Sequence, residues 1–267
     1  IPTGIHVMPD GTVYISDMMN HRVQKWLPGA TSGVTVAGGN GNGTAANQLK
    51  FPGDVVVASN GDVYVSDGLN SRVQKWAPGA TTGVTVAGGN GSGSAANQLH
   101  FNGGIFLKDG DLYILDCDNF RIQKWAAGAT TGVTVAGGNG YGPALNQVAV
   151  PSMAGGIYVD ANNSIYFTEY GYERVKKWEQ NATSATIVAG GNGQGAGANQ
   201  LHRPTGVIVD NAGENPILVK NLATVHESAM PRVGQTGLND QDDMVEGIVV
   251  MRKGENPQET LALIKAK

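Results

Sequence analysis

The stretch PGDVVVASNGDVYVSDGLNSRVQKW, residues Pro52–Trp76, contains three short segments rich in β-branched residues, with turn signals between them. Val55–Ala58 and Asp62–Ser66 flank the pair Asn60–Gly61. Such a pair reaches positive φ at low cost, so it joins neighbouring antiparallel strands. Valine, isoleucine, threonine and tyrosine suit the pleated surface of a strand. The stretch therefore predicts three consecutive strands of one antiparallel sheet, the third being Arg72–Trp76.

The same pattern occurs four times along the chain. Copies of the RVQKW segment lie at Arg22–Trp26, Arg72–Trp76, Arg121–Trp125 and Arg174–Trp178, and their tryptophans are 50, 49 and 53 residues apart. A fourth predicted strand, Gly33–Ala37 in the first copy, runs into AGGNG and then NQL, which recur at the same steps. Four short strands per unit of about 50 residues are typical of a propeller blade. We therefore predict an all-β β-propeller with four full four-stranded blades and a partial fifth.

The repeated run P-x-G-V-x-V-D…G-x-V-Y-V-S-D-x-x-N-x-R-V-Q-K-W resembles the NHL repeat. Pro52–Trp76 carries almost all of it, and Pro204–Asp210 carries its start. The resemblance covers residues 1–213, which we assign to one propeller domain. It implies a propeller that commonly serves as an interaction platform, in some members a secreted bacterial protein and in a few relatives a lyase. From it we expect a bacterial protein with an extracellular or periplasmic location. Because only four full copies are present, closure of the ring is left open.

Three positions carry the same kind of side chain in every copy. An acid ends each second strand, an arginine begins each third strand, and a tryptophan ends it. These are Asp17, Asp67, Asp116 and Glu169, then Arg22, Arg72, Arg121 and Arg174, then Trp26, Trp76, Trp125 and Trp178. The acid–arginine pairs have two interpretations: a ring of catalytic acid–base pairs, or charge-assisted hydrogen bonds that hold the turns. Catalysis needs one asymmetric constellation, so we predict the structural role. We expect the tryptophans to pack between blades.

The turn between the second and third strands varies from copy to copy. It reads MMNH at residues 18–21, GLNS at 68–71, CDNF at 117–120 and YGYE at 170–173. We expect these turns to lie on one face of the propeller, where such folds bind partners. Exposed aromatic and methionine side chains favour contact with a protein or ligand, although local loop packing is the alternative interpretation. The candidate partner-binding residues are Met18, Met19, His21, Leu69, Phe120, Tyr170 and Tyr172.

Composition argues against several classes of function. The net charge of −4 provides no basic surface for nucleic acid. The single cysteine, Cys117, cannot form a disulfide framework or a cysteine-rich zinc site. No run of 18 apolar residues occurs, so we expect no membrane span in this chain. His6 and Asp54 on the predicted inner strands are too few ligands for a metal, and we predict neither metal nor cofactor.

Residues 214–267 break the repeat, with less glycine and more charge. Three segments and the helix after them resemble the periplasmic porter domain of heavy-metal efflux pumps of the RND superfamily. The segments are Pro216–Val225 (PILVKNLATV), Pro231–Gly234 (PRVG) and Gly247–Asn256 (GIVVMRKGEN). We predict a short α/β tail of two strands and a helix at Pro257–Ala266 that Asn256 caps. We also expect Val207–Asp210 and Ile217–Lys220 to pair as a hairpin that adds to the partial fifth blade.

Two resemblances that meet near Gly213–Pro216 predict a chimera. The leading hypothesis for function is a non-enzymatic binding or scaffolding propeller that presents its loop face to a protein or carbohydrate. The alternative is a propeller lyase or lactonase with a metal in the central channel. A second alternative is a fragment of a heavy-metal efflux transporter.

Overall fold

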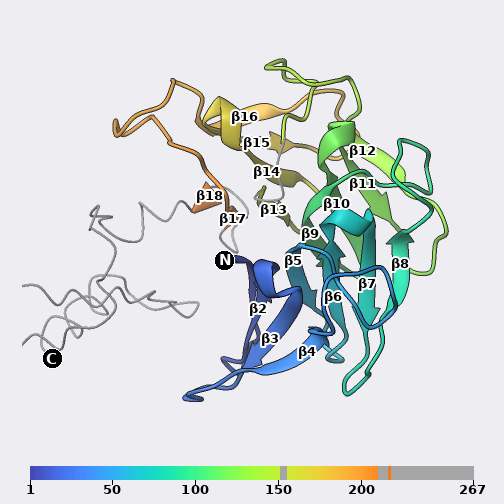
Figure 1. The fold of residues 1–267 in the computed structure, drawn as a ribbon. Coiled ribbons are helices and arrows are strands. Elements are labelled where there is room, and N and C mark those ends of the chain that lie inside the picture. The colour runs from blue at the N-terminus through green and yellow to red at the C-terminus, as the bar shows by residue number, and fades with distance from the viewer. Residues whose placement is uncertain (151–154, 210–215, 218–267) are drawn as a thin grey trace, which may run out of the picture. The chain divides into compact units, whose positions relative to one another are not determined.

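The computed structural model describes residues 1–150, 155–209 and 216–217. They belong to the first of the two units into which the chain divides, Ile1–Thr224. Their strands form four four-stranded antiparallel sheets and one two-stranded sheet (Figure 1). In each four-stranded sheet the strands pair in chain order, which makes the sheet a meander.

The strand boundaries follow the repeat. The first sheet contains β1 (Pro2–Val7), β2 (Val13–Asp17), β3 (Arg22–Trp26) and β4 (Val34–Gly38). The second contains β5 (Pro52–Val57), β6 (Val63–Asp67), β7 (Arg72–Trp76) and β8 (Val84–Gly88). The third contains β9 (Asn102–Lys108), β10 (Asp111–Asp116), β11 (Arg121–Trp125) and β12 (Val133–Gly137). The fourth contains β13 (Ile157–Val159), β14 (Ile165–Glu169), β15 (Arg174–Trp178) and β16 (Thr186–Gly190).

A one-turn 3₁₀ helix joins the second and third strands of every four-stranded sheet. These helices are η1 (Met18–Asn20), η2 (Gly68–Asn70), η3 (Cys117–Asn119) and η4 (Tyr170–Tyr172). Several of their residues differ from copy to copy. The repeat therefore holds its variable side chains on equivalent turns.

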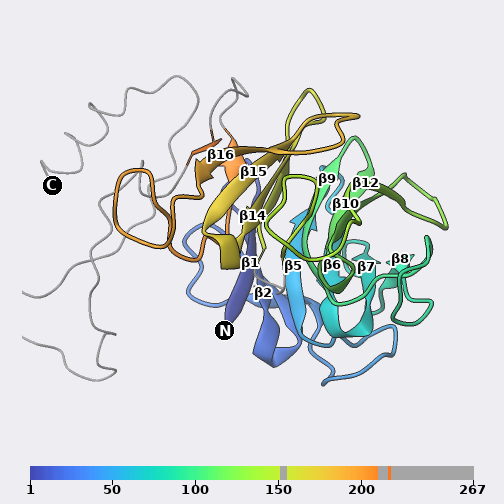
Figure 2. The same ribbon diagram turned by 90° about the horizontal axis from the view of Figure 1, so that it is seen from above.

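The first strands of successive sheets lie side by side, as seen in Figure 2. β1 contacts β5, β5 contacts β9, β9 contacts β13, and β13 contacts β17. Each fourth strand forms the opposite edge of its sheet. This is the arrangement of propeller blades, so the predicted fold class is confirmed, and the four sheets are called blades 1 to 4 below.

Apolar side chains fill the space between neighbouring blades. Val23 of blade 1 shares one buried cluster with Val65 and Trp76 of blade 2. Clusters of the same kind join blade 2 to blade 3 and blade 3 to blade 4. The tryptophans Trp76, Trp125 and Trp178 are 1%, 3% and 4% exposed. These three tryptophans lie in the clusters between neighbouring blades, whereas Trp26 is half-buried, because no described blade covers that side of blade 1.

A short hairpin follows blade 4. β17 (Ile208–Val209) pairs antiparallel with β18 (Pro216–Ile217). The predicted pairing is thus confirmed for Ile208 with Ile217, and Val209 pairs with the neighbouring Pro216, while residues 218–220 lie outside the described part of the chain. Val207 and Val209 are buried in a cluster with Val175 of blade 4. The predicted strand–strand–helix tail and its porter-domain resemblance concern residues that otherwise lie outside the described part of the chain. Among the described residues, no helix has the length and apolar character needed to cross a membrane.

Candidate functional site

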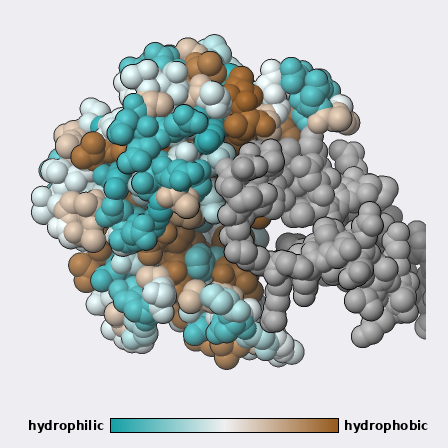
Figure 3. Space-filling model, turned by 180° about the vertical axis from the view of Figure 1, so that it is seen from behind, coloured by the Kyte–Doolittle hydropathy of each residue, from teal (hydrophilic) through white to brown (hydrophobic). Residues whose placement is uncertain are grey.

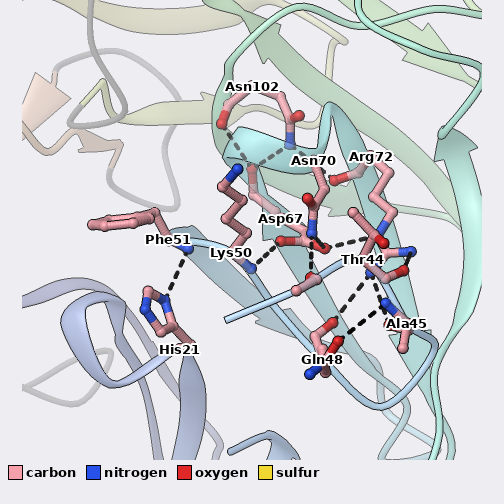
Figure 4. A network of polar contacts seen from close by, with 12 residues as sticks. His21, Thr44, Ala45, Gln48, Lys50, Phe51, Asp67, Asn70, Arg72 and Asn102 are labelled. Carbon is pink, nitrogen blue, oxygen red and sulfur yellow. Dashed lines mark hydrogen bonds and ion pairs between the residues drawn. The ribbon is translucent and has the colours of Figure 1, made fainter. Parts of the chain in front are cut away.

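Each blade carries an acid–arginine pair at the turn between its second and third strands, and Figure 4 shows the pair of blade 2. The Nε of Arg72 donates to Oδ2 of Asp67 over 2.7 Å. Asn70 Nδ2 donates to the same oxygen over 2.8 Å, and the backbone N–H of Lys50 donates to Oδ1 over 2.6 Å. Both carboxylate oxygens are therefore occupied by hydrogen bonds that hold the turn.

Arg72 also ties blade 2 to the loop that leaves blade 1. Its Nη1 donates to the carbonyl oxygen of Thr44 over 2.9 Å. Its Nη2 donates to the carbonyl oxygens of Ala45 and Gln48, each over 3.1 Å. Arg121 repeats these three contacts on the loop that leaves blade 2. The recurring pairs thus form the charge-assisted hydrogen bonds that the structural interpretation predicts, and the arginine also acts as a clamp between blades.

Blade 4 builds the same clamp from a different pair of side chains. Glu169 replaces the aspartate, and Lys176 stands where the other copies have glutamine. Oε2 of Glu169 accepts from Arg174 over 2.5 Å, and Oε1 accepts from Nζ of Lys176 over 3.0 Å. Lys176 also donates to the carbonyl oxygens of Ala144 and Gln147, each over 2.9 Å. Burial lowers the pKa of Lys176, and the charge of Glu169 opposes that shift.

The residue that ends each 3₁₀ turn has a left-handed backbone. These residues are His21, Ser71, Phe120 and Glu173, with φ of 52°, 51°, 53° and 52°. Residues other than glycine rarely adopt this conformation, because Cβ approaches the following carbonyl oxygen. None of the four is glycine or asparagine, so the sequence carries no signal for it. One backbone conformation thus presents four different side chains.

Two of the candidate residues, Phe120 and Tyr172, both contact Tyr141, which was not among the candidates. Tyr141 packs edge-on against Phe120 with 5.4 Å between ring centroids, and it lies 5.8 Å from the ring of Tyr172. Phe120 follows η3, Tyr172 ends η4, and Tyr141 lies in the glycine-rich loop after β12. We call these three rings the aromatic cluster. The corresponding positions in the other copies are Asn42, Ser92 and Gln194, so an alignment of the repeats would have singled out Tyr141.

The aromatic cluster is accessible and has charged neighbours. Tyr141 is 50% exposed, while Phe120 and Tyr172 are half-buried. The guanidinium of Arg174 lies 5.1 Å from the centroid of the Tyr172 ring. Desolvation, followed by the neighbouring Tyr141, raises the pKa of Tyr172, so its hydroxyl stays protonated and able to donate. Aromatic rings beside an arginine are the side chains that dominate binding at protein interfaces.

The other candidate residues make separate contacts. His21 packs edge-on against Phe51 at 4.9 Å, and its Nδ1 accepts from the backbone N–H of Phe51 over 3.2 Å. The ring of Tyr170 lies 5.4 Å from the guanidinium of Arg203. The remaining three candidates, all at least partly exposed, are Met18, Met19 and Leu69. Local packing therefore accounts for His21 and Tyr170, and these two candidates make contacts separate from those of Phe120 and Tyr172.

Two side chains considered above as candidate metal ligands lie on first strands, His6 on β1 and Asp54 on β5. Oδ2 of Asp54 accepts from the N–H of Ile105 over 2.9 Å, and Oδ1 accepts from the N–H of Val55 over 2.8 Å. Burial raises the pKa of Asp54 to about 7, although both hydrogen bonds act in the opposite direction. Burial lowers the pKa of His6. Within the residues that the structure describes, no group of three or more His, Cys, Asp or Glu side chains is placed to hold a metal ion.

Comparisons with known proteins agree with the fold. The family model of the NHL repeat matches residues 49–76. The chain is similar to a chain in a crystal structure of a nidogen/laminin complex, with a TM-score of 0.56 and 15% identity over 78% of this chain and 68% of that one. No curated protein matches the sequence.

Lyases of the same propeller class are more distant in structure. A streptogramin B lyase gives a TM-score of 0.44 and 14% identity over 70% of this chain and 53% of the lyase. An inactive virginiamycin B lyase from Staphylococcus aureus, determined with quinupristin, gives 0.44 and 16% over 70% of this chain and 54% of the lyase. The chain thus spans about half the length of these lyases.

Proposed function

We propose that this propeller is a non-enzymatic binding module whose loop face holds a protein partner through the aromatic cluster. The observation that supports the proposal is the contact of Phe120, Tyr141 and Tyr172 across blades 3 and 4, with Tyr141 half exposed. Large rigid rings bring much apolar area to an interface at little cost in conformational entropy. We place this binding in an extracellular or periplasmic setting.

The geometry of the rings favours a protein over a carbohydrate. Phe120 and Tyr141 meet edge to face, with 62° between their planes. Arg174 occupies the neighbourhood of the third ring. Angled aromatic rings, one of them packed against the buried Arg174, match apolar side chains of another protein. The nidogen/laminin complex, by its name, joins a structurally similar chain to a protein partner.

The polar frame of the blades supports a non-enzymatic role. The carboxylate of Asp67 already accepts from Arg72, Asn70 and the Lys50 backbone. This carboxylate is 0% exposed and already holds three donors, so a substrate cannot reach it. Asp116 repeats the three interactions in blade 3. A lyase that works at the centre of the ring is the second candidate function. It is favoured by Asp54, whose pKa of about 7 suits a general acid or base near neutral pH.

The test compares the cluster with an exposed apolar residue elsewhere. A displayed library of random peptides is panned on the full chain, and the same protein is applied to a glycan array. Peptides that bind are then measured by calorimetry against wild type, Tyr141→Ala and the double variant Phe120→Ala/Tyr172→Ala. We expect a loss of affinity of at least about tenfold for the single variant and no detectable binding for the double variant.

Val84→Ser is the matched control, because Val84 is 64% exposed on the outer strand β8. It should bind as wild type does. Equal affinity of wild type and the double variant would refute the cluster as the binding site. Glycans bound in place of peptides would refute the protein partner. Metal analysis addresses the lyase: one tightly held ion per chain would favour it.

A further inference from the structure

The surface seen in Figure 3 has separate hydrophobic patches between hydrophilic areas, so a second binding site has to be identified from individual residues. A lysine stands at the fourth position of the RVQKW segment in every blade. The ammonium of Lys25 lies 5.6 Å from the centroid of the Tyr14 ring, and that of Lys124 lies 5.6 Å from the ring of Tyr113. These two ammonium groups therefore occupy the same place in their blades.

A carboxylate neutralises this lysine in blades 2, 3 and 4 but not in blade 1. The pairs are Lys75 with Asp62 at 3.3 Å, Lys124 with Asp111 at 2.7 Å and Lys177 with Glu179 at 3.3 Å. In blade 1 the residue that corresponds to Asp62 and Asp111 is Thr12, which carries no charge. Within the described part of the chain, Lys25 thus contacts the ring of Tyr14 rather than a carboxylate.

Asp10, in the turn before β2, does not replace the carboxylate. Its Oδ1 accepts from the backbone N–H of Thr12 over 2.9 Å. Hydrogen bonds from Thr12 are the main cause that lowers the pKa of Asp10, and the charge of Lys25 is the smallest of the causes. Lys25 is half-buried, so part of its charge is removed from water. A cation in this position gains from an added carboxylate, because pairing offsets the cost of desolvation.

Lys25 lines a groove between blades 1 and 2 that has a volume of about 610 Å³. One wall is the outer strand β4, of which all five residues line the groove. The other wall is formed by residues 76–81, which end β7 and follow it. Lys25 pairs with Val34 across β3 and β4, and Val34 is 66% exposed. The groove therefore offers a positive charge directly beside accessible apolar surface.

A smaller groove of about 440 Å³ lies at the corresponding place between blades 3 and 4. Residues 134–137 of β12, which correspond to residues 35–38 of β4, form one wall, and Trp178, Ala182 and Thr183 line the other. Lys124, which Asp111 holds, is not among the described residues that line this groove. The groove thus comes with the packing of two blades, whereas the lysine without a carboxylate belongs to the groove between blades 1 and 2.

We propose that this groove binds an extended peptide segment of another protein, with an acidic side chain between apolar ones. The acidic side chain gives Lys25 the carboxylate that Asp62 gives Lys75. Among the described strands, β4 pairs only with β3, so the main chain of an added strand can pair with its other edge. A strand of this length spans about 16 Å, which matches a short extended peptide better than a small acid. Charge complementarity at one point then fixes the register of the peptide.

The experiment removes the aromatic cluster first, so that its result does not depend on the function proposed for that cluster. A displayed library of random peptides is panned on the full chain with Phe120→Ala/Tyr172→Ala, and the recovered peptides are measured by calorimetry in this background. We expect these peptides to carry aspartate or glutamate between apolar residues. Adding Lys25→Gln should weaken their binding by at least about tenfold, because the carboxylate loses its cation.

Position 12 separates the effect of charge from that of shape. Thr12→Asp gives blade 1 the aspartate of blades 2 and 3, which should hold Lys25 and weaken binding about as much as Lys25→Gln does. Thr12→Asn introduces a side chain of the same size without the charge, so it should bind nearly as the parent chain does. Lys75→Gln is the matched control for the lysine, because Asp62 already holds Lys75 and the peptide should bind unchanged. Circular dichroism verifies that each variant is folded.

Amide NMR signals of isotope-labelled protein locate the bound peptide. Signals of residues 34–38 and 76–81 should shift when an acidic peptide is added. The proposal is overturned if no acidic peptide is recovered, or if Thr12→Asp and Thr12→Asn weaken binding equally, since charge would then not be the cause. Octanoate is the probe for a small acid: shifts of these signals with octanoate, when the library yields no peptide, would replace the peptide with a small carboxylic acid.

Discussion

Blades 1 and 2 carry the same five letters, RVQKW, at Arg22–Trp26 and Arg72–Trp76, but the two segments have different surroundings. In blade 2 the tryptophan is 1% exposed and the arginine holds the loop of the blade before it. In blade 1 the tryptophan is half-buried, and among the residues that the structure describes the arginine holds only Asp17. The same residue is therefore buried and hydrogen-bonded to a different extent depending on the blade beside it. This is expected for an array in which each unit contacts only the next.

The largest expected difference concerns the tryptophans. Trp76→Ala should lower the free energy of unfolding by about 3–5 kcal/mol, because it leaves a cavity between two blades. Trp26→Ala should cost roughly half of that or less, because Trp26 already contacts solvent. Urea unfolding followed by circular dichroism measures both. Equal losses would mean that the outer side of blade 1 is covered in solution and would contradict the prediction.

The arginines should differ almost as much. Arg72→Ala leaves the buried carboxylate of Asp67 without its cation and three carbonyl oxygens without a donor, which costs about 3 kcal/mol. Arg22→Ala removes one exposed pair, worth up to about 1 kcal/mol. The same unfolding curves measure both at low protein concentration. A loss of several kcal/mol for Arg22→Ala would show that its guanidinium has a partner in the isolated chain.

Blade 4 allows a test of whether its clamp is a matched pair. Lys176→Gln alone leaves Glu169 short of a donor and should cost about 2 kcal/mol. Adding Glu169→Asp gives blade 4 the same aspartate and glutamine as blade 2. Arg174 can then reach the carbonyl oxygens that Lys176 now holds. We expect the double variant to be about 1 kcal/mol more stable than the sum of the single changes. Additive effects would contradict the pairing.

The smallest effect concerns pH. The pKa of Asp54 is raised from 3.8 to about 7, so the folded state binds a proton that the unfolded state has released between those values. The stability that this proton contributes is lost as the pH rises from about 4 to 7. Over that pH range, the free energy of unfolding of wild type should fall relative to that of Asp54→Asn. The total fall should be on the order of 1 kcal/mol, since Asp54 keeps part of its contact with solvent. Unfolding midpoints at pH 4.5 and 7.5 measure it, and parallel profiles would contradict the shift.

The sequence predicts most of the fold, because the repeat is written in local signals. The strands at Arg22–Trp26 and its three copies begin and end where RVQKW predicts. The half-burial of Trp26 could not be predicted, since it depends on which blade stands beside it. In the candidate site, Phe120 and Tyr172 were among the candidates, whereas Tyr141 was missed because it directly follows the constant AGGNG segment, which was interpreted as a turn.

The left-handed residues at the ends of the 3₁₀ turns have a consequence for engineering. At such a position any non-glycine residue costs about 1 kcal/mol, nearly independent of its side chain. The acid–arginine pair at each turn holds the loop in place, so the side chain of the left-handed residue is not needed for that purpose. Positions 21, 120 and 173 are therefore natural sites for randomisation, whereas Ser71 is buried, and a combinatorial library restricted to these three would sample new specificities on an unchanged scaffold.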